Sequence, residues 1–321
     1  MSFFEIQGLR MHYATSRGRV KAIRGVDLKM DKGQALGLAG ESGCGKTSLG
    51  LSILRLLPNN AHITRGRILF HGEDLLRKSE EEMRRIRWKY ISMVFQSAMN
   101  ALNPVYRVGD QIVEAILAHE DITKDEAKER VSELFSLVGL DPGRAGQYPH
   151  EYSGGMRQRA VIAMALACHP ELLIADEPTT ALDVIHQKQI IEKMDELREK
   201  LGMTMIYITH DIAIISETCD VMAVMYGGKI VESSKVRDLL RRPMHPYTQG
   251  LIRSIPPLHD SVGRLTSIEG EPPSLLSPPR GCSFNPRCAY SRDICRTSEP
   301  PLRQLNGGLV ACHFAEEIPW P

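Results

Sequence analysis

The sequence predicts an α/β fold in which helices cover a mostly parallel sheet. Strand and helix patterns alternate between residues 34 and 233. Residues 171–176 and 203–208 are apolar on both faces, which is typical of strands buried within a parallel sheet. The chain has 321 residues, 42% of them hydrophobic, so it is long enough for one large domain and a smaller appendage.

The N-terminal part contains the patterns of two kinds of strand. Residues 3–35 alternate apolar and polar positions between turn residues, which predicts antiparallel strands. Residues 34–40 predict a short buried strand that leads into a glycine-rich turn, and residues 47–57 have helical periodicity. Helix signals are frequent over residues 80–165, and we expect a helical subdomain at about 90–165.

The pattern changes in the last quarter of the chain. Residues 184–202 predict an amphipathic helix that ends at Gly202, and strands are expected at 203–210 and 221–233. From residue 241 onward prolines are dense and periodicity fades. We therefore expect a domain over residues 1–240 and an irregular, cysteine-bearing C-terminal extension over residues 241–321.

The charge balance and apolar patterning limit the class of protein. The formal net charge is +1, so the composition does not indicate a nucleic-acid binder. No apolar run approaches the roughly 20 residues that cross a bilayer. The first residues carry Glu5 and no long apolar stretch, so they do not resemble a signal peptide. We expect a cytoplasmic protein that reaches a membrane only through a partner.

The segment GESGCGKTS fits the phosphate-loop pattern GxxxxGK[ST] between a predicted strand and a predicted helix. Glycines let the backbone curl so that its N–H groups face a phosphate at the helix N-terminus. Lys46 would place its charge on the β- and γ-phosphates, and the Thr47 hydroxyl would bind Mg²⁺. The alternative is a chance glycine-rich turn. The residues expected to bind nucleotide are Gly40, Ser42, Gly43, Cys44, Gly45, Lys46, Thr47 and Ser48.

A second motif, LLIADEP, supplies two adjacent carboxylates at the end of a buried strand. Asp176 is expected to bind Mg²⁺ through water, and Glu177 to accept a proton from the attacking water. Adjacent acids at a strand end could also be a solvated turn. Because the same chain contains a phosphate-loop motif, the catalytic interpretation of these two acids is favoured.

The segment YSGGMRQR places Ser153, Gly154 and Gly155 at the start of a helix, where a hydroxyl and backbone amides can bind an anion. Here the sequence resembles the ABC transporter ATPase family, although Tyr152 and Met156 stand where leucine and glutamine are commoner. A glycine-rich helix start without a ligand is the alternative. The resemblance implies a P-loop NTPase fold with a RecA-like core, an antiparallel β subdomain and an α-helical subdomain. It also implies that this turn binds the γ-phosphate held by a second subunit.

Further family markers follow in the expected order. Tyr13 resembles the aromatic residue that stacks on adenine, and Gln96 resembles the glutamine that touches Mg²⁺ and the attacking water. The segment ALD, with Asp183 as its polar member, resembles the loop that couples two active sites. His210 resembles the switch histidine that reaches the γ-phosphate. Taken alone, a tyrosine or a histidine in such a strand is usually structural.

Three segments resemble the ATP-binding subunits of the peptide-nickel importers, which carry dipeptides and oligopeptides. They are residues 99–112, 241–251 with its HPYT sequence, and the cysteine-bearing tail. The chain is identified as a dipeptide "D"-type subunit. The resemblance implies a paralogous ATPase partner, with a homodimer as the alternative in isolation, two membrane permease subunits and an extracytoplasmic binding protein. Nickel and oligosaccharides are alternative cargoes. A soluble ABC ATPase of DNA repair or translation and a degenerate, non-enzymatic module are the rival functions.

Four of the seven cysteines, Cys282, Cys288, Cys295 and Cys312, lie in the last 40 residues. Their spacings lack the CxxC pairs of structural zinc sites. Four thiolates suit an iron–sulfur cluster or zinc, and the resemblance favours [4Fe–4S]. Free or oxidised thiols remain an alternative, and His313 could replace one ligand. Because the tail shows no hydrophobic core, we expect such a group to stabilise it.

Overall fold

The computed structural model describes residues 2–96, 101–179, 182–254 and 268–320. These residues form two compact units. The first contains Met1–Asp31, Ala35–Leu76 and Ile208–Pro321, and the second contains Lys32–Gln34 and Arg77–Tyr207. The expected boundary at residue 240 coincides with no boundary between these units and stays a prediction.

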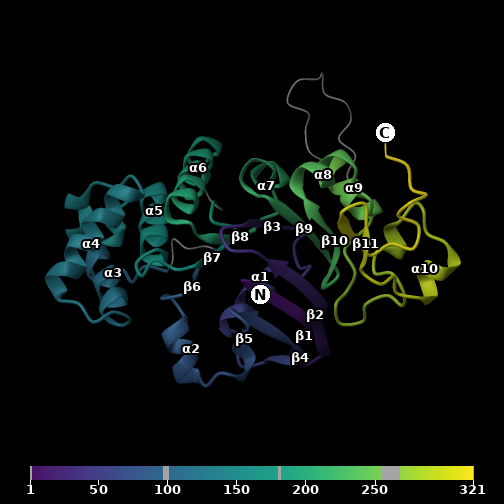
Figure 1. Cartoon of the computed structure of the whole chain (residues 1–321), viewed down its shortest axis with the longest axis horizontal. Coiled ribbons are helices and arrows are strands. Elements are labelled where there is room, and N and C mark those ends of the chain that lie inside the picture. Colours follow the sequence, from purple (N-terminus) through teal and green to yellow (C-terminus); the bar gives the residue numbers. More distant parts are fainter. Residues whose placement is uncertain (1, 97–100, 180–181, 255–267, 321) are drawn as a thin grey trace. The chain divides into compact units, whose positions relative to one another are not determined.

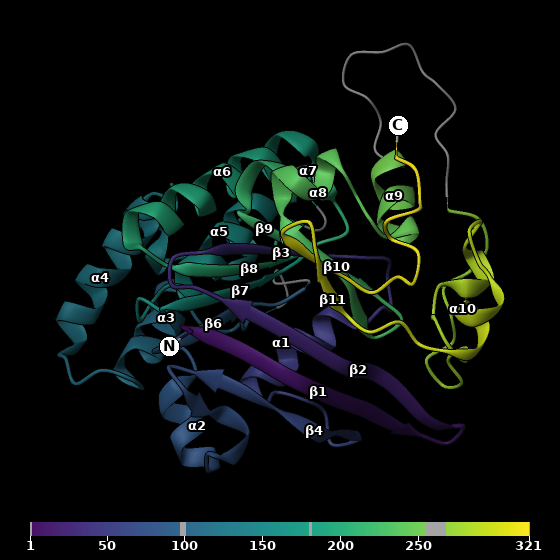
Figure 2. The same cartoon turned by 45° about the vertical axis from the view of Figure 1, so that its right-hand side comes forward.

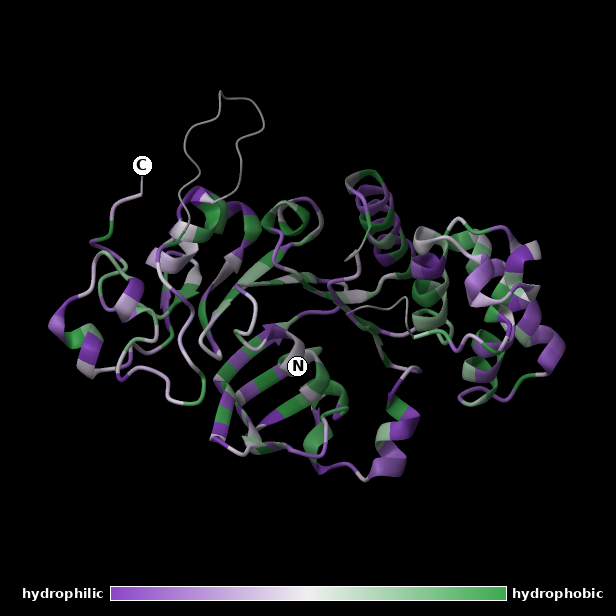
Figure 3. Cartoon of the chain, turned by 180° about the vertical axis from the view of Figure 1, so that it is seen from behind, coloured by the Kyte–Doolittle hydropathy of each residue, from purple (hydrophilic) through white to green (hydrophobic). Residues whose placement is uncertain are grey.

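An antiparallel sheet of the first unit is formed by β1 (Phe4–Thr15), β2 (Gly18–Met30), β4 (Ala61–Phe70) and β5 (Glu73–Asp74). The strands lie in the order β2-β1-β4-β5, and the three long ones run side by side in Figures 1 and 2. Hydrophobic and hydrophilic positions alternate along them (Figure 3), because alternate side chains point to opposite faces of a sheet. The antiparallel strands predicted within residues 3–35 are confirmed.

Five strands of this unit belong to a second sheet and follow the order β11-β12-β10-β9-β3. Strand β3 (Ala35–Ala39) pairs in parallel with β9 (Val221–Tyr226), whereas β10 (Lys229–Lys235), β12 (Gly308–Val310) and β11 (Arg303–Leu305) pair antiparallel. The prediction of one strand over residues 221–233 was wrong. Gly227 and Gly228 have φ of 54° and 81°, and this left-handed pair turns the chain into a β9–β10 hairpin.

In the described part of this unit, five helices accompany the sheets: α1 (Lys46–Leu54), α7 (Ile212–Thr218), α8 (Val236–Arg241), α9 (Pro246–Arg253) and α10 (Asp293–Thr297). Three aromatic side chains from distant segments pack in its core. The Tyr226 ring lies 4.4 Å from that of Tyr247 and 5.2 Å from that of Phe284, measured between centroids. All three are buried.

The expectation that the tail lacks a hydrophobic core was therefore wrong. Phe284, which lies between two tail cysteines, belongs to the same buried cluster as Tyr226 and Tyr247. Val310 and Ala315 form a second cluster with Met244. The tail contributes few apolar residues, but they complete clusters built by other segments. A periodicity search of the tail alone cannot detect such shared packing.

The second unit contains the parallel pair β6 (Ile91–Val94) and β7 (Leu172–Asp176), with β8 (Thr204–Ile208) beside β7. Its helices are α2 (Glu80–Ile86), α3 (Val108–Leu117), α4 (Lys124–Leu137), α5 (Gly154–Ala165) and α6 (Val184–Leu201). Helices α3, α4 and α5 lie together (Figure 1). Gly202 caps α6 at φ 62°, as predicted. None of the helices in the described ranges is both long and apolar enough to cross a membrane.

Candidate functional site

The glycine-rich loop joins β3 to α1 in the first unit, where the pattern placed it. Gly40 and Gly45 have φ of 149° and 110°. A Cβ atom on Gly40 would lie 2.2 Å from the Met225 carbonyl oxygen, and one on Gly45 would lie 2.4 Å from that of Ala22. Glycine is therefore required at both positions. The first N–H groups of α1 receive no side-chain cap, which suits an anion at this helix end.

Lys46 is buried, although it is the cation expected to bind phosphates. Its Nζ donates to the carbonyl oxygens of Gly40 at 2.6 Å and Glu41 at 3.1 Å. The third donor of the ammonium group contacts the Cys44 Sγ at 3.7 Å. Binding a triphosphate must therefore exchange at least part of this bonding. Burial raises the pKa of the neighbouring Cys44 thiol, which supports a packing role for Cys44 over a redox role. Ser42 and Gly43 are exposed.

Tyr13 of β1 lies next to the start of α1. Its hydroxyl is 2.9 Å from the Oγ of Ser48. Tyr13 as a whole is half-buried. The expected contact of its ring with adenine stays a prediction. Thr47 and His210 also belong to this unit, and His210 is exposed, two residues after the end of β8.

The acidic pair lies in the second unit. Asp176 ends β7 and is only 1% exposed. Glu177 follows it with φ 44°, a left-handed conformation that is uncommon for residues other than glycine. The Nε2 of Gln96 donates to the Oε2 of Glu177 at 3.1 Å. Two residues predicted separately as catalytic are thus brought together, and such backbone strain often occurs at functional sites.

The Ser-Gly-Gly turn starts α5 in this unit, as the motif predicts. Ser153 is the N-cap, and its Oγ accepts from the Met156 N–H at 3.3 Å. Ser153 is exposed, and Gly154 and Gly155 are half-buried. The helix thus presents a hydroxyl and backbone amides to the exterior of the unit, and this arrangement can bind an anion.

Asp183 is the N-cap of α6. It accepts from the His186 N–H at 3.1 Å and lies 2.6 Å from the His186 Nδ1. The hydrogen bond from the His186 backbone lowers the pKa of this carboxyl. Ala181 of the same motif, like Met99 and Asn100 of the predicted importer segment, lies outside the described residues. A capping role for Asp183 is clear, and its role in coupling two sites stays a prediction.

All four tail cysteines line one small apolar cavity in the first unit, together with Phe284 and Phe314. None of them forms a disulfide. Burial raises the pKa of Cys282 to about 11 and that of Cys312 to about 12. Without a bound cation these two thiols are therefore protonated at neutral pH. Nε2 of His313 lies 3.0 Å from the Ser298 carbonyl oxygen, which argues against this nitrogen as a ligand.

The geometry distinguishes between two kinds of metal group. Among the described residues, no three His, Cys, Asp or Glu side chains are placed to hold a single metal ion. Zinc would bring four sulfur atoms to about 2.3 Å from one point. An iron–sulfur cluster instead carries each thiolate on a different iron atom, so its ligands surround a larger group. The four cysteines therefore share one cavity without the arrangement of a single-ion site in the described residues.

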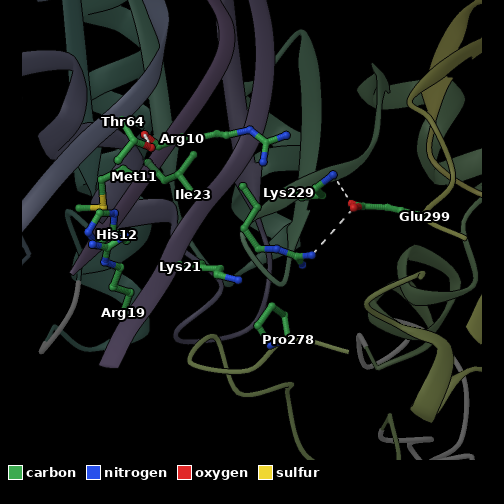
Figure 4. Close-up of a pocket in the computed structure, with 11 residues that line it drawn as sticks. Arg10, Met11, His12, Arg19, Lys21, Ile23, Thr64, Lys229, Pro278 and Glu299 are labelled. Carbon is green, nitrogen blue, oxygen red and sulfur yellow. Dashed lines mark hydrogen bonds and ion pairs between the residues drawn. The ribbon is translucent and has the colours of Figure 1, made fainter. Parts of the chain in front are cut away.

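A larger hollow of about 410 Å³ lies against β1 and β2 and contains none of the predicted site residues. It is lined by several cations, including Arg10, Arg19 and Lys21 (Figure 4). Glu299 of the tail forms ion pairs with Lys229 and, at 3.9 Å, with Arg24. These charge pairs attach the tail to the rest of the unit. No observation at this hollow indicates catalysis.

No sequence pattern indicated the role of four residues that connect the glycine-rich loop and β10 to the C-terminal segments. They are Glu41, Glu232, Tyr247 and Arg287. The Glu232 carboxylate is buried and accepts from the N–H groups of Met244 at 2.7 Å and His245 at 2.9 Å. The HPYT sequence was the only signal for this region. It identifies a family segment, but not the contact between the Tyr247 hydroxyl and the Glu41 N–H at 2.8 Å.

The comparisons with known proteins cover both parts of the chain. A family model described as ABC transporter matches residues 23–180, and one described as the oligopeptide/dipeptide transporter C-terminal region matches residues 231–295. The chain is 50% identical to the dipeptide transport ATP-binding protein DppD of Bacillus subtilis, over 90% of this chain and 88% of that protein.

Two further similarities agree with this result. The chain is 48% identical to the oligopeptide transport ATP-binding protein OppD of Bacillus subtilis, over 94% of this chain and 86% of that protein. The solved structure of MJ0796, a dimeric bacterial ABC transporter cassette, is similar with a TM-score of 0.66 and 25% identity, over 73% of this chain and 99% of that chain.

Proposed function

The chain belongs to the ABC transporter family and is the ATP-binding, ATP-hydrolysing subunit of a peptide importer, and from this premise we propose that two ATPase subunits complete each ATP site. The observation that carries the proposal is the exposed Ser153 hydroxyl at the N-terminus of α5. Such a helix end attracts a phosphate. The chain therefore has two phosphate-binding helix starts, the glycine-rich loop before α1 and the Ser-Gly-Gly turn before α5. A triphosphate held by one subunit is capped by the Ser-Gly-Gly turn of the other.

The nucleotide is bound by residues of the first unit. Tyr13 stacks on the adenine, the amides of residues 40–48 cradle the phosphates, and Lys46 leaves its loop carbonyls to reach the β- and γ-phosphates. Oxygen donors suit Mg²⁺. As the family resemblance implies, the Thr47 hydroxyl would bind it, the Gln96 side chain would touch it and the Asp176 carboxylate would bind it through water. When bound, the ion neutralises charge on the phosphates.

Hydrolysis depends on Glu177. Its carboxylate accepts a proton from a water molecule whose oxygen bonds to the γ-phosphorus, while the bond to the bridging oxygen breaks and ADP leaves. The products are ADP and inorganic phosphate. Gln96 supports this proposal because its amide already touches the carboxylate and can orient the water. His210 reaches the γ-phosphate and Asp183 couples the paired sites when the subunits close.

The partners follow from the importer class. We infer a heterodimer with a paralogous ATPase subunit, two membrane permeases and an extracytoplasmic peptide-binding protein. The chain then works at the cytoplasmic face of the membrane as a peripheral subunit of the dipeptide "D" type. Closure of the ATPase pair is transmitted to the permeases by the helical subdomain.

We also propose that Cys282, Cys288, Cys295 and Cys312 hold a [4Fe–4S] cluster that stabilises the tail. The shared cavity and the absence of disulfides support this assignment. Anaerobically purified protein should be brown and contain iron and acid-labile sulfide in equal amounts. A colourless, folded and iron-free protein would refute the cluster.

Reconstitution tests the transport function. The chain would be purified with its paralogous ATPase, permeases and binding protein, and placed in lipid vesicles that contain ATP. We expect peptide uptake that requires ATP and is lost in a Lys46→Ala variant. The Lys188→Ala variant, which changes an exposed lysine of α6, serves as the control. Uptake of nickel or oligosaccharides in place of peptides would overturn the cargo assignment, and ATPase activity that peptide does not stimulate would overturn the coupling.

A further inference from the structure

Glu41, the second residue of the glycine-rich loop, has every polar group engaged. Its carbonyl oxygen accepts from Lys46 Nζ at 3.1 Å, and its N–H donates to the Tyr247 hydroxyl at 2.8 Å. Its carboxylate oxygens accept from the two terminal nitrogens of Arg287 at 2.7 and 3.0 Å. One residue thus connects the phosphate-binding lysine to two side chains from the C-terminal region.

Arg287 is built into the tail rather than spread on the surface. Its side chain is 5% exposed. Its Nε and Nη2 donate to the carbonyl oxygens of Glu269 at 2.8 Å and Ile268 at 3.1 Å, and Nη1 also reaches the Tyr226 hydroxyl at 3.3 Å. Because these contacts already hold the guanidinium, it loses little conformational entropy when it binds the Glu41 carboxylate. Its two-point contact with a carboxylate therefore fixes both distance and direction.

The position of Arg287 in the chain connects it to the cysteine cavity. It lies between Cys282 and Cys288, which both line the cavity. The intervening chain turns tightly, because the Asn285 N–H donates to the Cys282 carbonyl oxygen at 3.0 Å and the Arg287 N–H to that of Phe284 at 3.0 Å. Whatever binds the two thiols therefore fixes both ends of the segment that carries the guanidinium.

We propose that Arg287 is a positioning residue for ATP binding, through which the cysteine segment controls the shape of the glycine-rich loop. Arg287 does not touch the nucleotide. It holds the Glu41 carboxylate, so the Glu41 carbonyl and the neighbouring amides keep their directions when Lys46 moves to the phosphates. Loss of order in the cysteine segment releases Glu41 and weakens nucleotide binding. By thermodynamic linkage, bound nucleotide also favours the ordered cysteine segment.

Nucleotide titration of the full-length chain tests this proposal, with a fluorescent ATP analogue as the probe. We expect Arg287→Gln and Glu41→Gln each to weaken binding about tenfold, and the double variant to be no weaker than either single one, because both remove the same interaction. Arg287→Lys keeps the charge but loses the two-point contact, so an intermediate affinity is expected. In the assembled importer, Arg287→Gln should raise KM for ATP with little change in kcat.

Arg85→Gln is the matched control. Arg85 also pairs with a carboxylate, that of Glu81 at 2.8 Å, but it lies on α2 outside the tail, and both side chains are more than half exposed. Its removal should leave nucleotide affinity unchanged. Thermal unfolding of every variant separates a positioning effect from a general loss of structure. A folded Arg287→Gln variant with unaltered affinity overturns the proposal, and so do additive losses in the double variant.

A further comparison concerns the cysteines and rests on the proposed cluster. Cys288→Ser should weaken nucleotide binding in the wild-type background but add nothing in the Arg287→Gln background. An effect of the same size in both backgrounds would overturn the connection through Arg287. Iron content is measured in the same samples. Iron-free wild-type protein would refute the cluster alone, because the effect of Arg287→Gln on affinity does not require iron.

Discussion

The Gln96 amide and the Glu177 carboxylate share a hydrogen bond of 3.1 Å, although they are separated by 81 residues in the chain. Glu177 also adopts a left-handed backbone conformation. The amide donor thus contacts the carboxylate that is proposed to accept a proton from the attacking water. This relationship makes Glu177 the first residue to test.

Glu177→Gln should retain ATP binding but slow hydrolysis about a hundredfold to ten-thousandfold, because an amide cannot act as the base. With ATP the variant should accumulate as a closed pair of ATPase subunits. Single-turnover hydrolysis and size-exclusion chromatography measure these two effects. Glu192→Gln, on the exposed face of α6, is the control. Wild-type turnover in Glu177→Gln would remove Glu177 from its role as base.

Ser153 has both a structural and a proposed ligand-binding role, and two substitutions separate them. Ser153→Ala removes the cap of α5 and should cost about 1 kcal/mol of stability, whereas Ser153→Asp can still cap. Aspartate at a helix N-terminus is also electrostatically favourable. It would nevertheless place negative charge where the partner's γ-phosphate is expected.

We therefore expect Ser153→Asp to unfold at the wild-type temperature and yet to fail in hydrolysis by the ATPase pair. Thermal unfolding and steady-state ATPase assays of the assembled pair measure the two properties. Normal hydrolysis by Ser153→Asp would exclude the turn as a phosphate cap and leave it a structural helix start.

The elements that the sequence predicted well are those whose physical requirements are local. Gly40 and Gly45 need a conformation that only glycine adopts easily, so their spacing marks the loop. Apolar residues at the first four positions of β7 mark a buried strand, and its carboxyl end then locates Asp176.

No local sequence pattern predicted the contacts between segments that lie far apart in the chain. Arg287 and Glu41 are separated by 246 residues, and nothing near either position indicates the other. Glu232 looked like an ordinary strand residue, yet its buried carboxylate binds two backbone N–H groups of the segment after α8. The tail likewise appeared to lack a core because Phe284 packs on tyrosines from other segments. Such relationships depend on topology, which local patterns do not encode.

Tyr13 allows the ring and the hydroxyl to be tested separately. Tyr13→Phe removes the hydrogen bond to Ser48 but keeps the ring, so nucleotide affinity should change little. Tyr13→Ala removes the stacking surface, which is worth about 1–3 kcal/mol for a base, so affinity should fall about tenfold or more. Isothermal titration with ATP compares the two. Equal losses in both variants would assign the effect to the hydroxyl and contradict adenine stacking.

His245 gives the fold a dependence on pH. Its side chain is 1% exposed, and burial lowers its pKa to about 3. Nδ1 accepts from the Tyr247 N–H at 3.1 Å, which requires the neutral ring. The unfolded chain binds a proton on this histidine near its ordinary pKa of about 6.5. The stabilising contribution is therefore complete above that pH and is lost as the pH falls toward 3.

A substitution isolates this contribution from other titrating groups. Burial raises the pKa of Glu232, so protonation of Glu232 favours the folded state as the pH falls and partly masks the effect of His245. His245→Asn can keep the cap of α9 but cannot titrate. Below pH 6.5 the stability of wild type should decline relative to His245→Asn by up to about 1.4 kcal/mol per pH unit. Urea unfolding at a series of pH values measures the difference, and parallel curves would show that His245 can accept a proton without loss of the fold.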